Sequence, residues 1–306
     1  MLPKRPLGSS DLYVSELGLG CMSLGTDLAK AEFIIKSAYE EGINFFDTAD
    51  LYDFGENEKL IGQALKPFRD KVILATKVGN RPNQQKDGWS WDPSKSYIKE
   101  AVKNSLKRLN TDYIDLYQLH GGTILDPIDE TIEAFEELKD EGYIRYYGIS
   151  SIRPNIIREY AHKSNLVSVM MQYSLLDRRP EEETLPLLHQ HDISVITRGT
   201  LAKGLLSNEM MKKVSLSIRE KGYLDYTFSE LTYVVEKLQA NFNRPLNELA
   251  LQYNLANPTV ASVIVGASTV EQLKKNVQAV KGEKLSKNEL KQLQSYTKKN
   301  VYQEHR

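Results

Sequence analysis

Residues 43–52 read INFFDTADLY, and this stretch organises the chain. Three of its first four residues are apolar, as expected of a strand that is buried on both faces. The run ends on Asp47, and Tyr52 follows on a polar loop before GENEKLIGQAL (55–65), which has the pattern of a helix. An acid that closes a buried strand, with a phenol on the loop beyond it, favours chemistry at the C-terminal edge of a sheet. An aspartate in this place also serves as a helix cap or turn residue.

Two further strand ends carry polar residues of the same kind. Residues 72–78, VILATKV, are apolar except for Thr76 and Lys77, and residues 113–120, YIDLYQLH, end on His120. A lysine at the end of an apolar strand needs a partner, because an unpaired buried charge costs several kcal/mol. In a parallel barrel the C-terminal ends of the strands converge on one face, so these side chains are expected to meet there.

The rest of the chain alternates between strand-like and helix-like segments, which predicts a parallel sheet. Eight strands favour closure into a (β/α)8 TIM barrel, here predicted as a single domain over 1–306, with an N-terminal β-hairpin within residues 1–15 and extra helices near the C-terminus. No GxGxxG follows an early strand, which argues against a Rossmann fold. The predicted strands are 16–21, 43–48, 72–78, 113–119, 144–149, 168–173, 193–198 and 262–266; the predicted helices are 28–41, 56–66, 94–109, 127–141, 153–163, 181–190 and 286–300.

Bulk properties exclude several classes of function. The net charge of −1 and a pI near 6.6 argue against nucleic acid as the main partner. A single cysteine, Cys21, rules out an intrachain disulfide and suits a reducing, cytoplasmic location. No segment resembles a signal peptide or a membrane span, so no membrane partner is expected. No pair of histidines has zinc-ligand spacing with carboxylates or thiols nearby, so no metal is expected.

The motifs together resemble the aldo-keto reductases. FDTADLY (46–52), ATK (75–77) and the strand ending LH (119–120) occur in the family's order, and the likeness runs from GLGCMSLG (18–25) to VIVGASTVEQLKKN (263–276). The chain is most similar to the bacterial general-stress branch, which also resembles the potassium-channel beta subunits. The resemblance implies an eight-stranded barrel, a nicotinamide cofactor and reduction of a small-molecule carbonyl. It leaves the oligomeric state open, because the family includes monomers and assemblies.

The resemblance assigns catalytic roles to Asp47, Tyr52, Lys77 and His120. Reduction of a carbonyl needs a hydride on carbon and a proton on oxygen, and Tyr52 is the predicted proton donor. A tyrosine is a weak acid at neutral pH, so we expect the ammonium of Lys77 to lower its pKa, with Asp47 holding Lys77 charged and His120 orienting the substrate oxygen. The alternative is a buried Asp–Lys pair beside a tyrosine and a histidine that only pack.

The cofactor contacts are likewise implied by resemblance, and the cofactor is predicted to be NADPH. A small polar pair and a glutamine at the ends of the fifth and sixth strands would hold the nicotinamide carboxamide, GTLAKGLLS (199–207) would pass beside the pyrophosphate, and the segment 266–276 would surround the adenosine end. The expected contacts are Cys21, Met22, Ser150, Ser151, Gln172, Arg198, Gly199, Thr200, Leu201, Gly204, Leu205, Ser207, Gly266, Ser268, Gln272, Lys275 and Asn276. Strand-end Ser and Gln residues and an ST-capped helix also occur without any ligand.

Two departures from the family pattern concern the cofactor. Arg198 stands where many members have an aromatic residue that stacks on the nicotinamide. Gly266 and Gln272 replace a basic pair near the adenosine phosphate, which weakens the expected preference for NADPH over NADH. Backbone N–H groups at the helix start after Ser268, together with Lys275, still offer donors and a cation to a 2′-phosphate.

The remaining segments leave alternatives open. Residues 79–93 form a long polar stretch with two tryptophans that either rims the substrate pocket or packs on neighbouring helices, and residues 199–230 form a second long connection. His162, His189, His191 and His305 are expected on the surface. Two rival functions share this barrel: a non-catalytic nucleotide-sensing regulatory subunit, and an isomerase or lyase with a phosphate-bearing substrate.

Overall fold

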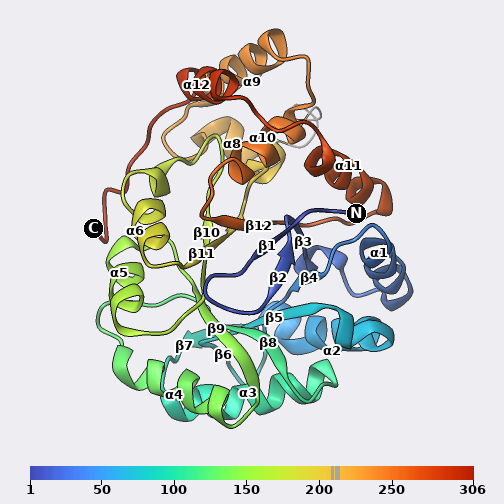
Figure 1. The fold of residues 1–306 in the computed structure, drawn as a ribbon, viewed down its shortest axis with the longest axis vertical. Helices are drawn as coiled ribbons and strands as arrows, with labels where there is room; N and C mark the ends of the chain where they lie inside the picture. The colour runs from blue at the N-terminus through green and yellow to red at the C-terminus, as the bar shows by residue number, and fades with distance from the viewer. Residues whose placement is uncertain (208–209, 211–213) are drawn as a thin grey trace.

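The computed structural model describes residues 1–207, 210 and 214–306. Eight parallel strands close into a barrel in the order β10-β11-β12-β3-β4-β5-β8-β9. This closure confirms the predicted (β/α)8 architecture, with every predicted barrel strand present (Figure 1). The strands are β3 (Leu17–Gly20), β4 (Phe45–Asp47), β5 (Ile73–Val78), β8 (Ile114–Leu119), β9 (Ile144–Ser150), β10 (Ser168–Gln172), β11 (Ser194–Arg198) and β12 (Val260–Val265).

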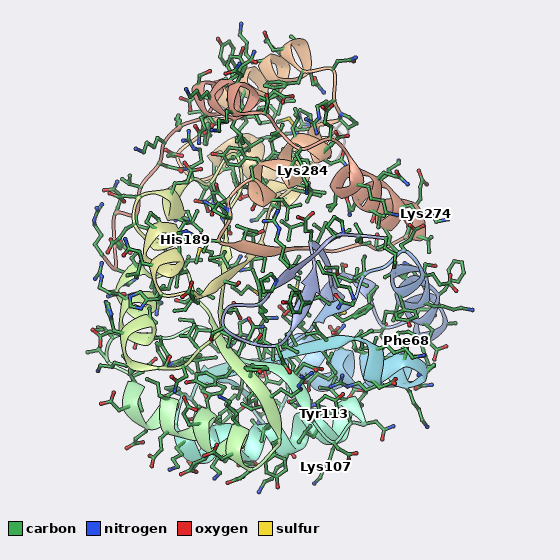
Figure 2. The ribbon with its side chains drawn as sticks, in the orientation of Figure 1. Phe68, Lys107, Tyr113, His189, Lys274 and Lys284 are labelled. Atoms are coloured by element: carbon green, nitrogen blue, oxygen red, sulfur yellow. The ribbon has the colours of Figure 1, made fainter. Side chains whose placement is uncertain are left out.

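Helices surround the barrel, and α9 and α12 lie outside this ring beside each other, at the top of Figure 1. The exposed side chains of Lys107 and Lys274 lie on the outer margin of the molecule (Figure 2). The helices are α1 (Leu28–Glu40), α2 (Glu56–Leu65), α3 (Lys95–Leu109), α4 (Ile128–Asp140), α5 (Pro154–Lys163), α6 (Thr184–Gln190), α8 (Leu216–Lys221), α9 (Phe228–Asn241), α10 (Leu246–Leu255), α11 (Val270–Lys281) and α12 (Lys287–Tyr296). Short 3-10 turns are η1 (Cys21–Leu24), η2 (Tyr52–Gly55), η3 (Lys66–Lys71), η4 (Arg179–Glu181) and η5 (Ala202–Gly204).

Local sequence determines where several helices begin. The hydroxyl of Ser286 accepts from the backbone N–H of Glu289, while the carboxylate of Glu289 accepts from the N–H of Ser286, which is a capping box at the start of α12. Thr227 and Glu230 form the same motif at the start of α9. Such caps satisfy N–H groups that have no partner inside the helix.

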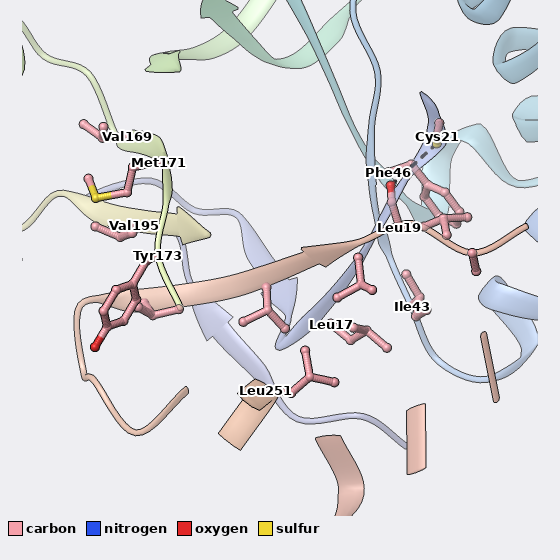
Figure 3. Packing of buried hydrophobic residues seen from close by; sticks show 14 of the residues in the cluster. Leu17, Leu19, Cys21, Ile43, Phe46, Val169, Met171, Tyr173, Val195 and Leu251 are labelled. Atoms are coloured by element: carbon pink, nitrogen blue, oxygen red, sulfur yellow. Dashed lines mark hydrogen bonds between the residues drawn. The ribbon is translucent and has the colours of Figure 1, made fainter. Parts of the chain in front are cut away.

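The strands alternate between two hydrophobic layers, and this alternation positions the site. Phe46, Leu74 and Tyr117 point outward and pack beneath the helices. Figure 3 shows part of this outer layer, including Phe46, Leu17 and Leu251. Phe45, Ala75 and Leu116 point inward and fill the barrel. Since side chains on a strand alternate with a period of two, the next inward positions are Asp47, Lys77 and Gln118.

The N-terminal hairpin closes the other end of the barrel, as predicted. Strands β1 (Lys4–Pro6) and β2 (Tyr13–Ser15) pair antiparallel, and Leu7, Leu12 and Val14 pack into the inner layer. The Arg5 guanidinium fixes the hairpin to the last part of the barrel. It donates to the carbonyl oxygens of Leu255 and Val260 at 2.8 Å each, and its Nε donates to Glu16 at 2.8 Å.

Three segments differ in detail from the sequence-based expectation. Residues 79–93 contain a second hairpin, β6 (Asn80–Pro82) with β7 (Trp89–Trp91), rather than an irregular loop. The connection 199–230 includes η5 and α8, but its residues 208–209 and 211–213 lie outside the described residues. The final helix ends at Tyr296 rather than 300. Among the described residues, no helix is long and apolar enough to cross a membrane.

Candidate active site

The four predicted catalytic residues come from three adjacent strands of the barrel. Asp47 is the last residue of β4, Lys77 lies in β5, and His120 directly follows β8. Tyr52 begins η2, where Asp53 and Phe54 have φ values of 48° and 51°. Residues other than glycine seldom adopt this left-handed conformation, and such strain is concentrated at functional sites. The turn lies directly after the tyrosine that the sequence predicts as proton donor.

Lys77 is fully buried and uses all three of its N–H donors. Its Nζ donates to Asp47 Oδ1 at 2.8 Å, to Asp47 Oδ2 at 2.7 Å and to the carbonyl oxygen of Thr48 at 2.7 Å. Three acceptors around one nitrogen suit an ammonium, which has three donors and no lone pair. Lys77 is therefore a fixed positive charge at the mouth of the barrel.

The electrostatics of this pair follow from burial and attraction. Burial opposes the charge of Lys77, but Asp47 attracts it, Tyr52 adds to that attraction, and together they raise the pKa of Lys77 above its ordinary value. Burial also raises the pKa of Asp47, while Lys77 and Gln118 oppose this shift. Each charge compensates the other, so removal of either partner would leave an uncompensated buried charge.

Tyr52 lies against both Lys77 and His120. Lys77 Nζ is 5.2 Å from the centroid of the Tyr52 ring, and the ring meets His120 edge to face. Lys77 lowers the pKa of Tyr52, as the sequence led us to expect, but it does not determine the net shift. Burial raises the pKa of Tyr52 and the carboxylate of Asp47 adds to this, and these effects outweigh the opposing charge of Lys77. Tyr52 therefore keeps its proton at neutral pH.

His120 is neutral in this environment. Burial lowers the pKa of His120 to about 3, and the positive charges of Lys77 and Arg198 contribute to the shift. Its backbone N–H donates to the carbonyl oxygen of Val78 at 2.7 Å, which ties it to the end of β5. Among the described residues its Nδ1 is buried without a hydrogen-bond partner. A neutral imidazole can donate or accept a hydrogen bond at the reacting oxygen without carrying charge.

Sequence reasoning missed several buried polar residues that support the four. Asn57 on α2 accepts from the Thr48 hydroxyl at 2.6 Å and donates to the carbonyl oxygen of Cys21 at 3.1 Å. Thr48 is the residue whose backbone oxygen binds Lys77. Asn57 therefore joins α2 and η1 to the end of β4. The signal was an asparagine at a core-facing position of a helix, which a pattern of apolar residues does not register.

Glu58 supports the neighbouring strand in a similar way. It is fully buried, accepts from the hydroxyl of Thr76 at 2.6 Å and pairs with Arg108 Nε at 2.6 Å. Thr76 is the outward-facing neighbour of Lys77 on β5. Asp50, which lies between Asp47 and Tyr52 in the chain, is also buried, and burial together with Glu58 raises its pKa well above the ordinary range.

The predicted nicotinamide contacts lie on the strands that follow around the barrel. Gln172 ends β10 beside Arg198, which ends β11, and Arg198 Nη1 donates to Gln172 Oε1 at 3.3 Å. Gln172 Nε2 donates to Asp177 Oδ2 at 2.7 Å, and Asp177 in turn binds Arg179 at 2.7 Å. A carboxylate can accept a hydrogen bond only from the nitrogen of the Gln172 amide, not from its oxygen. Asp177 therefore fixes the Gln172 side chain with the Gln172 carbonyl oxygen toward Arg198.

The serine pair and the segment 199–207 lie along the same edge. Ser150 is the register partner of Met170 at the end of β9, and Ser151 is buried, with its Oγ accepting from the N–H of Arg153 at 3.3 Å. Gly199 has a φ of 69° and packs against Gln172. The hydroxyl oxygens of Thr197 and Thr200 are 3.3 Å apart. Ser207 Oγ donates to the carbonyl oxygen of Gly204 at 2.7 Å. The other predicted contacts of this segment are Leu201 and Leu205.

The predicted adenosine contacts gather where β12 runs into α11. A Cβ on Gly266 would lie 2.7 Å from Ser23 Oγ, so only glycine permits this approach to η1. Gln272 Oε1 accepts from both the N–H and the hydroxyl of Ser268 at 3.0 Å, and Lys275 pairs with Glu271 at 2.8 Å. Asn276 is mostly buried on α11.

The two groups of predicted residues divide the barrel mouth between them. The four catalytic candidates lie on β4 and β5 or in the segments that follow β4 and β8, and most predicted cofactor contacts lie at the ends of the other five strands or in the loops beyond them. Cys21 and Met22, which are also predicted cofactor contacts, lie in η1 directly after β3. Met22 is exposed, whereas Cys21 is buried, and burial raises the pKa of its thiol, which therefore stays protonated. The four remaining histidines, His162, His189, His191 and His305, are exposed as expected.

Neither of two cavities in the molecule contains the four catalytic candidates. One of about 380 Å³ lies between α6, α10 and α12, with Leu185, Tyr253 and Leu290 in its wall. The other, of about 300 Å³, lies between residues 25–28 and the start of α2. We locate the site from the buried charges and hydrogen bonds, because catalytic groups are recognised by their chemistry and mutual geometry. The described residues contain no group of three or more His, Cys, Asp or Glu that could hold a metal ion.

Comparisons with known proteins show the family of the chain. The model of the Aldo/keto reductase family matches residues 16–298. The chain is 60% identical to the uncharacterized oxidoreductase YqkF of Bacillus subtilis (strain 168), over 99% of each chain. It is 32% identical to the NADH-specific methylglyoxal reductase of Escherichia coli (strain K12), covering 91% of this chain and 94% of that one. The holo form of the aldo-keto reductase AKR11C1 from Bacillus halodurans superimposes with a TM-score of 0.95 at 60% identity, covering 100% of this chain and 99% of that chain.

Proposed function

This chain belongs to the aldo/keto reductase family, as its motifs predicted, and we propose that it reduces an aldehyde or ketone to an alcohol with NADPH, with Tyr52 as the proton donor. The family and its oxidoreductase relatives make the chain an NAD(P)H-dependent reductase of carbonyl compounds. The identity of the acid, the roles of the other site residues and the choice of NADPH are the proposed part. One observation carries the proposal: a buried, fully paired ammonium on Lys77 lies beside a protonated Tyr52.

Tyr52 acts as the general acid. Its raised pKa keeps the phenol protonated until the substrate oxygen gains negative charge. The fixed charge of Lys77 then stabilises the phenolate that remains, since an opposite charge a few ångström away favours the ionised form. Asp47 holds Lys77 charged and in place through its two short hydrogen bonds. The pair thus acts on the product of proton transfer more than on the resting phenol.

His120 orients the substrate oxygen and keeps water and charge away from it. Its imidazole is neutral and meets Tyr52 edge to face, so a carbonyl oxygen that receives a hydrogen bond from Tyr52 also lies within reach of the imidazole. A neutral donor polarises the carbonyl without competing for the proton. Tyr52 and His120 together define one position for the reacting oxygen.

The residues on the other strands suit a nicotinamide cofactor. Gln172 has a carbonyl oxygen held toward the mouth by Asp177, and Ser150 lies one strand away, which offers an acceptor and a donor for a carboxamide. A bound NADPH supplies the hydride. The first turn of α11 and Lys275 support a preference for the 2′-phosphate, because N–H groups at a helix start and a cation both favour an anion. Arg198, which hydrogen-bonds Gln172, would face the nicotinamide.

The test is turnover of a reactive aldehyde followed by the loss of NADPH absorbance near 340 nm. We expect reduction by the wild type with NADPH, slower reduction with NADH, and loss of most of the reduction in Tyr52→Phe. A wild type that binds NADPH but reduces no aldehyde or ketone would instead favour the nucleotide-sensing regulatory subunit. Since none of the four catalytic residues is missing from the site, the geometry favours the enzyme.

A further inference from the structure

Gln118 lies inside the barrel among the catalytic residues, although nothing in the family motifs assigns it a role. It is the Cα partner of Lys77 in the register between β5 and β8. Its position is two residues before His120, so its side chain shares the inward face with both. It is fully buried. Leu116, the previous inward position on β8, is part of the apolar inner layer. Gln118 therefore places an amide inside the barrel, one inward position beyond that layer.

Within the part of the chain that the structure describes, the one hydrogen bond of the Gln118 side chain is to Asp47. Its Nε2 donates to Asp47 Oδ1 at 3.4 Å, the same oxygen that accepts from Lys77 Nζ at 2.8 Å. Gln118 thus reaches Asp47 from β8 while Lys77 reaches it from β5. A carboxylate held from two strands cannot rotate away from the ammonium without losing one of its donors.

The other end of the same amide has no partner. Among the described residues, Gln118 Oε1 is buried without a hydrogen bond. A buried polar atom left unpaired costs stability, and replacing it with an apolar group of similar shape is often neutral or stabilising. Among the described residues, the Oε1 end of Gln118 thus has no hydrogen bond that would favour an amide over an apolar side chain here. Local rules of this kind are broken mainly at functional sites.

We propose that Gln118 is a positioning residue of the catalytic site, which holds Asp47 in the orientation that keeps both of its oxygens on Lys77. Without it, Asp47 is restrained by Lys77 alone, and the ammonium loses its fixed place beside Tyr52. The consequence is a slower chemical step with little change in substrate binding, because Gln118 is buried beneath the site and contacts Asp47 rather than the substrate. The inference rests on the proposed carbonyl reduction.

The effect should depend on pH in a defined direction. The groups around Asp47 are Lys77 from β5, Gln118 from β8, the Cys21 thiol from η1, Tyr52 from η2 and Arg198 from β11. The hydrogen bond from Gln118 stabilises the ionised form of Asp47, so its loss raises the pKa of Asp47. Asp47 then becomes protonated at a higher pH than in the wild type. The deficit in turnover should therefore grow as the pH falls.

The experiment compares Gln118→Met with Gln252→Met, a matched control. Gln252 on α10 is also a buried glutamine with an unpaired Oε1, but its Nε2 donates to the carbonyl oxygens of Ala279 and Val280 at 2.9 Å each, away from the catalytic site. Both variants keep the length of the side chain and remove the amide. Measurements are kcat and KM for aldehyde reduction between pH 5 and 9, and Tm.

For Gln118→Met we expect kcat to fall about tenfold at neutral pH, since hydrogen bonds to charged groups are worth more than neutral ones. KM should stay within about twofold and Tm should equal or exceed that of the wild type. Gln252→Met should lower Tm and leave kcat unchanged. A Gln118→Met enzyme with wild-type kcat at every pH, a loss that does not grow toward low pH, or a fall in Tm like that of the control would overturn the proposal. A wild type without aldehyde turnover would instead contradict the proposed function.

Discussion

The imidazole of His120 meets the phenol ring of Tyr52 edge to face, with ring centroids 6.0 Å apart and an interplanar angle of 83°. Burial, together with the positive charges of Lys77 and Arg198, disfavours the charged form of His120 in this position. The same contact brings the two groups to one side of the barrel mouth. Beside Tyr52, the imidazole of His120 is therefore neutral.

His120 should remain neutral over the whole physiological pH range. Its pKa is lowered to about 3, by burial first and then by Lys77 and Arg198, so the imidazolium forms only well below pH 5. NMR titration of the imidazole nitrogens, with His120→Gln to assign the signal, measures this directly. A His120 signal that titrates near the ordinary value of about 6.5 would contradict the assigned environment.

Tyr52→Phe should retain the fold and lose most of the reduction. The ring still packs against His120, and only the donated proton is removed, so activity should fall by about 10²–10⁴-fold. Aldehyde turnover, near-UV circular dichroism and the Kd for NADPH separate chemistry from folding and binding. Near-wild-type turnover of an unactivated aldehyde would show that another group supplies the proton.

Lys77→Met should destabilise the protein as well as abolish its activity. The substitution leaves Asp47 buried without its partner, which typically costs about 3–5 kcal/mol. Because burial raises the pKa of Asp47, the unpaired carboxyl is less costly once protonated, and the deficit in the free energy of unfolding should shrink as the pH falls from 7 toward 5.

The matched variant for this test is the double substitution Asp47→Leu and Lys77→Met. It removes both charges, so it should recover much of the stability and show no dependence of the deficit on Asp47 protonation. Its activity should stay as low as that of the single variant. Chemical denaturation at several pH values measures both, and a double variant less stable than the single one would show that the pair is held by other contacts.

Arg198→Tyr should change the relative affinity for the two redox forms of the cofactor. Arg198 hydrogen-bonds Gln172, so its charge lies where the nicotinamide ring is proposed to bind. A guanidinium stacks acceptably on the neutral reduced ring and repels the positively charged oxidised ring at short range. We expect the ratio of the Kd values for NADP⁺ and NADPH to decrease in the variant. An unchanged ratio would mean that Arg198 does not act on the redox pair.

The charge next to Lys275 should influence the choice between NADPH and NADH. Lys275 pairs with the exposed carboxylate of Glu271 at 2.8 Å, which opposes an incoming 2′-phosphate. Glu271→Gln removes that negative charge and should tighten NADPH binding about two- to fivefold with little effect on NADH, since exposed ion pairs are weak. Lys275→Ala should weaken NADPH binding alone. Equal effects on both cofactors would show that the phosphate is not bound here.

The strand ends were predictable from sequence because each polar residue follows an apolar run. Lys77 interrupts VILAT at a point where an unpaired charge would be too costly, and Asp47 and His120 close strands in the same way. The capped helices α9 and α12 carry equally local signals, although only the second was identified. The sequence therefore predicts a structural position well where a residue type in its local setting, such as a lysine in an apolar strand, has few possible structural roles.

What sequence reasoning missed depends on distant partners. The role of Gln118 follows from its hydrogen bond to Asp47, which is 71 residues away in the chain. The role of Asn57 follows from its hydrogen bonds to Thr48 and Cys21. The net pKa shift of Tyr52 depends on how much water the fold excludes, which no local pattern reports. The polar stretch 79–93 became a hairpin because the Trp91 ring covers Gly79 and Gly121 and its Nε1 donates to Asp126 at 3.0 Å.

The Arg5 contacts place a constraint on the order in which the molecule can assemble. The guanidinium on the first strand binds the carbonyl oxygens of Leu255 and Val260, which are 250 and 255 residues further along the chain. During synthesis the amino-terminal hairpin is made first, yet the carbonyl groups that bind Arg5 appear only when the last barrel strand has been translated. Closing so long a loop is entropically costly and slow. Until the barrel closes, the apolar residues Leu7, Leu12 and Val14 of the nascent chain therefore stay without part of their final contacts, accessible to chaperones and prone to aggregation.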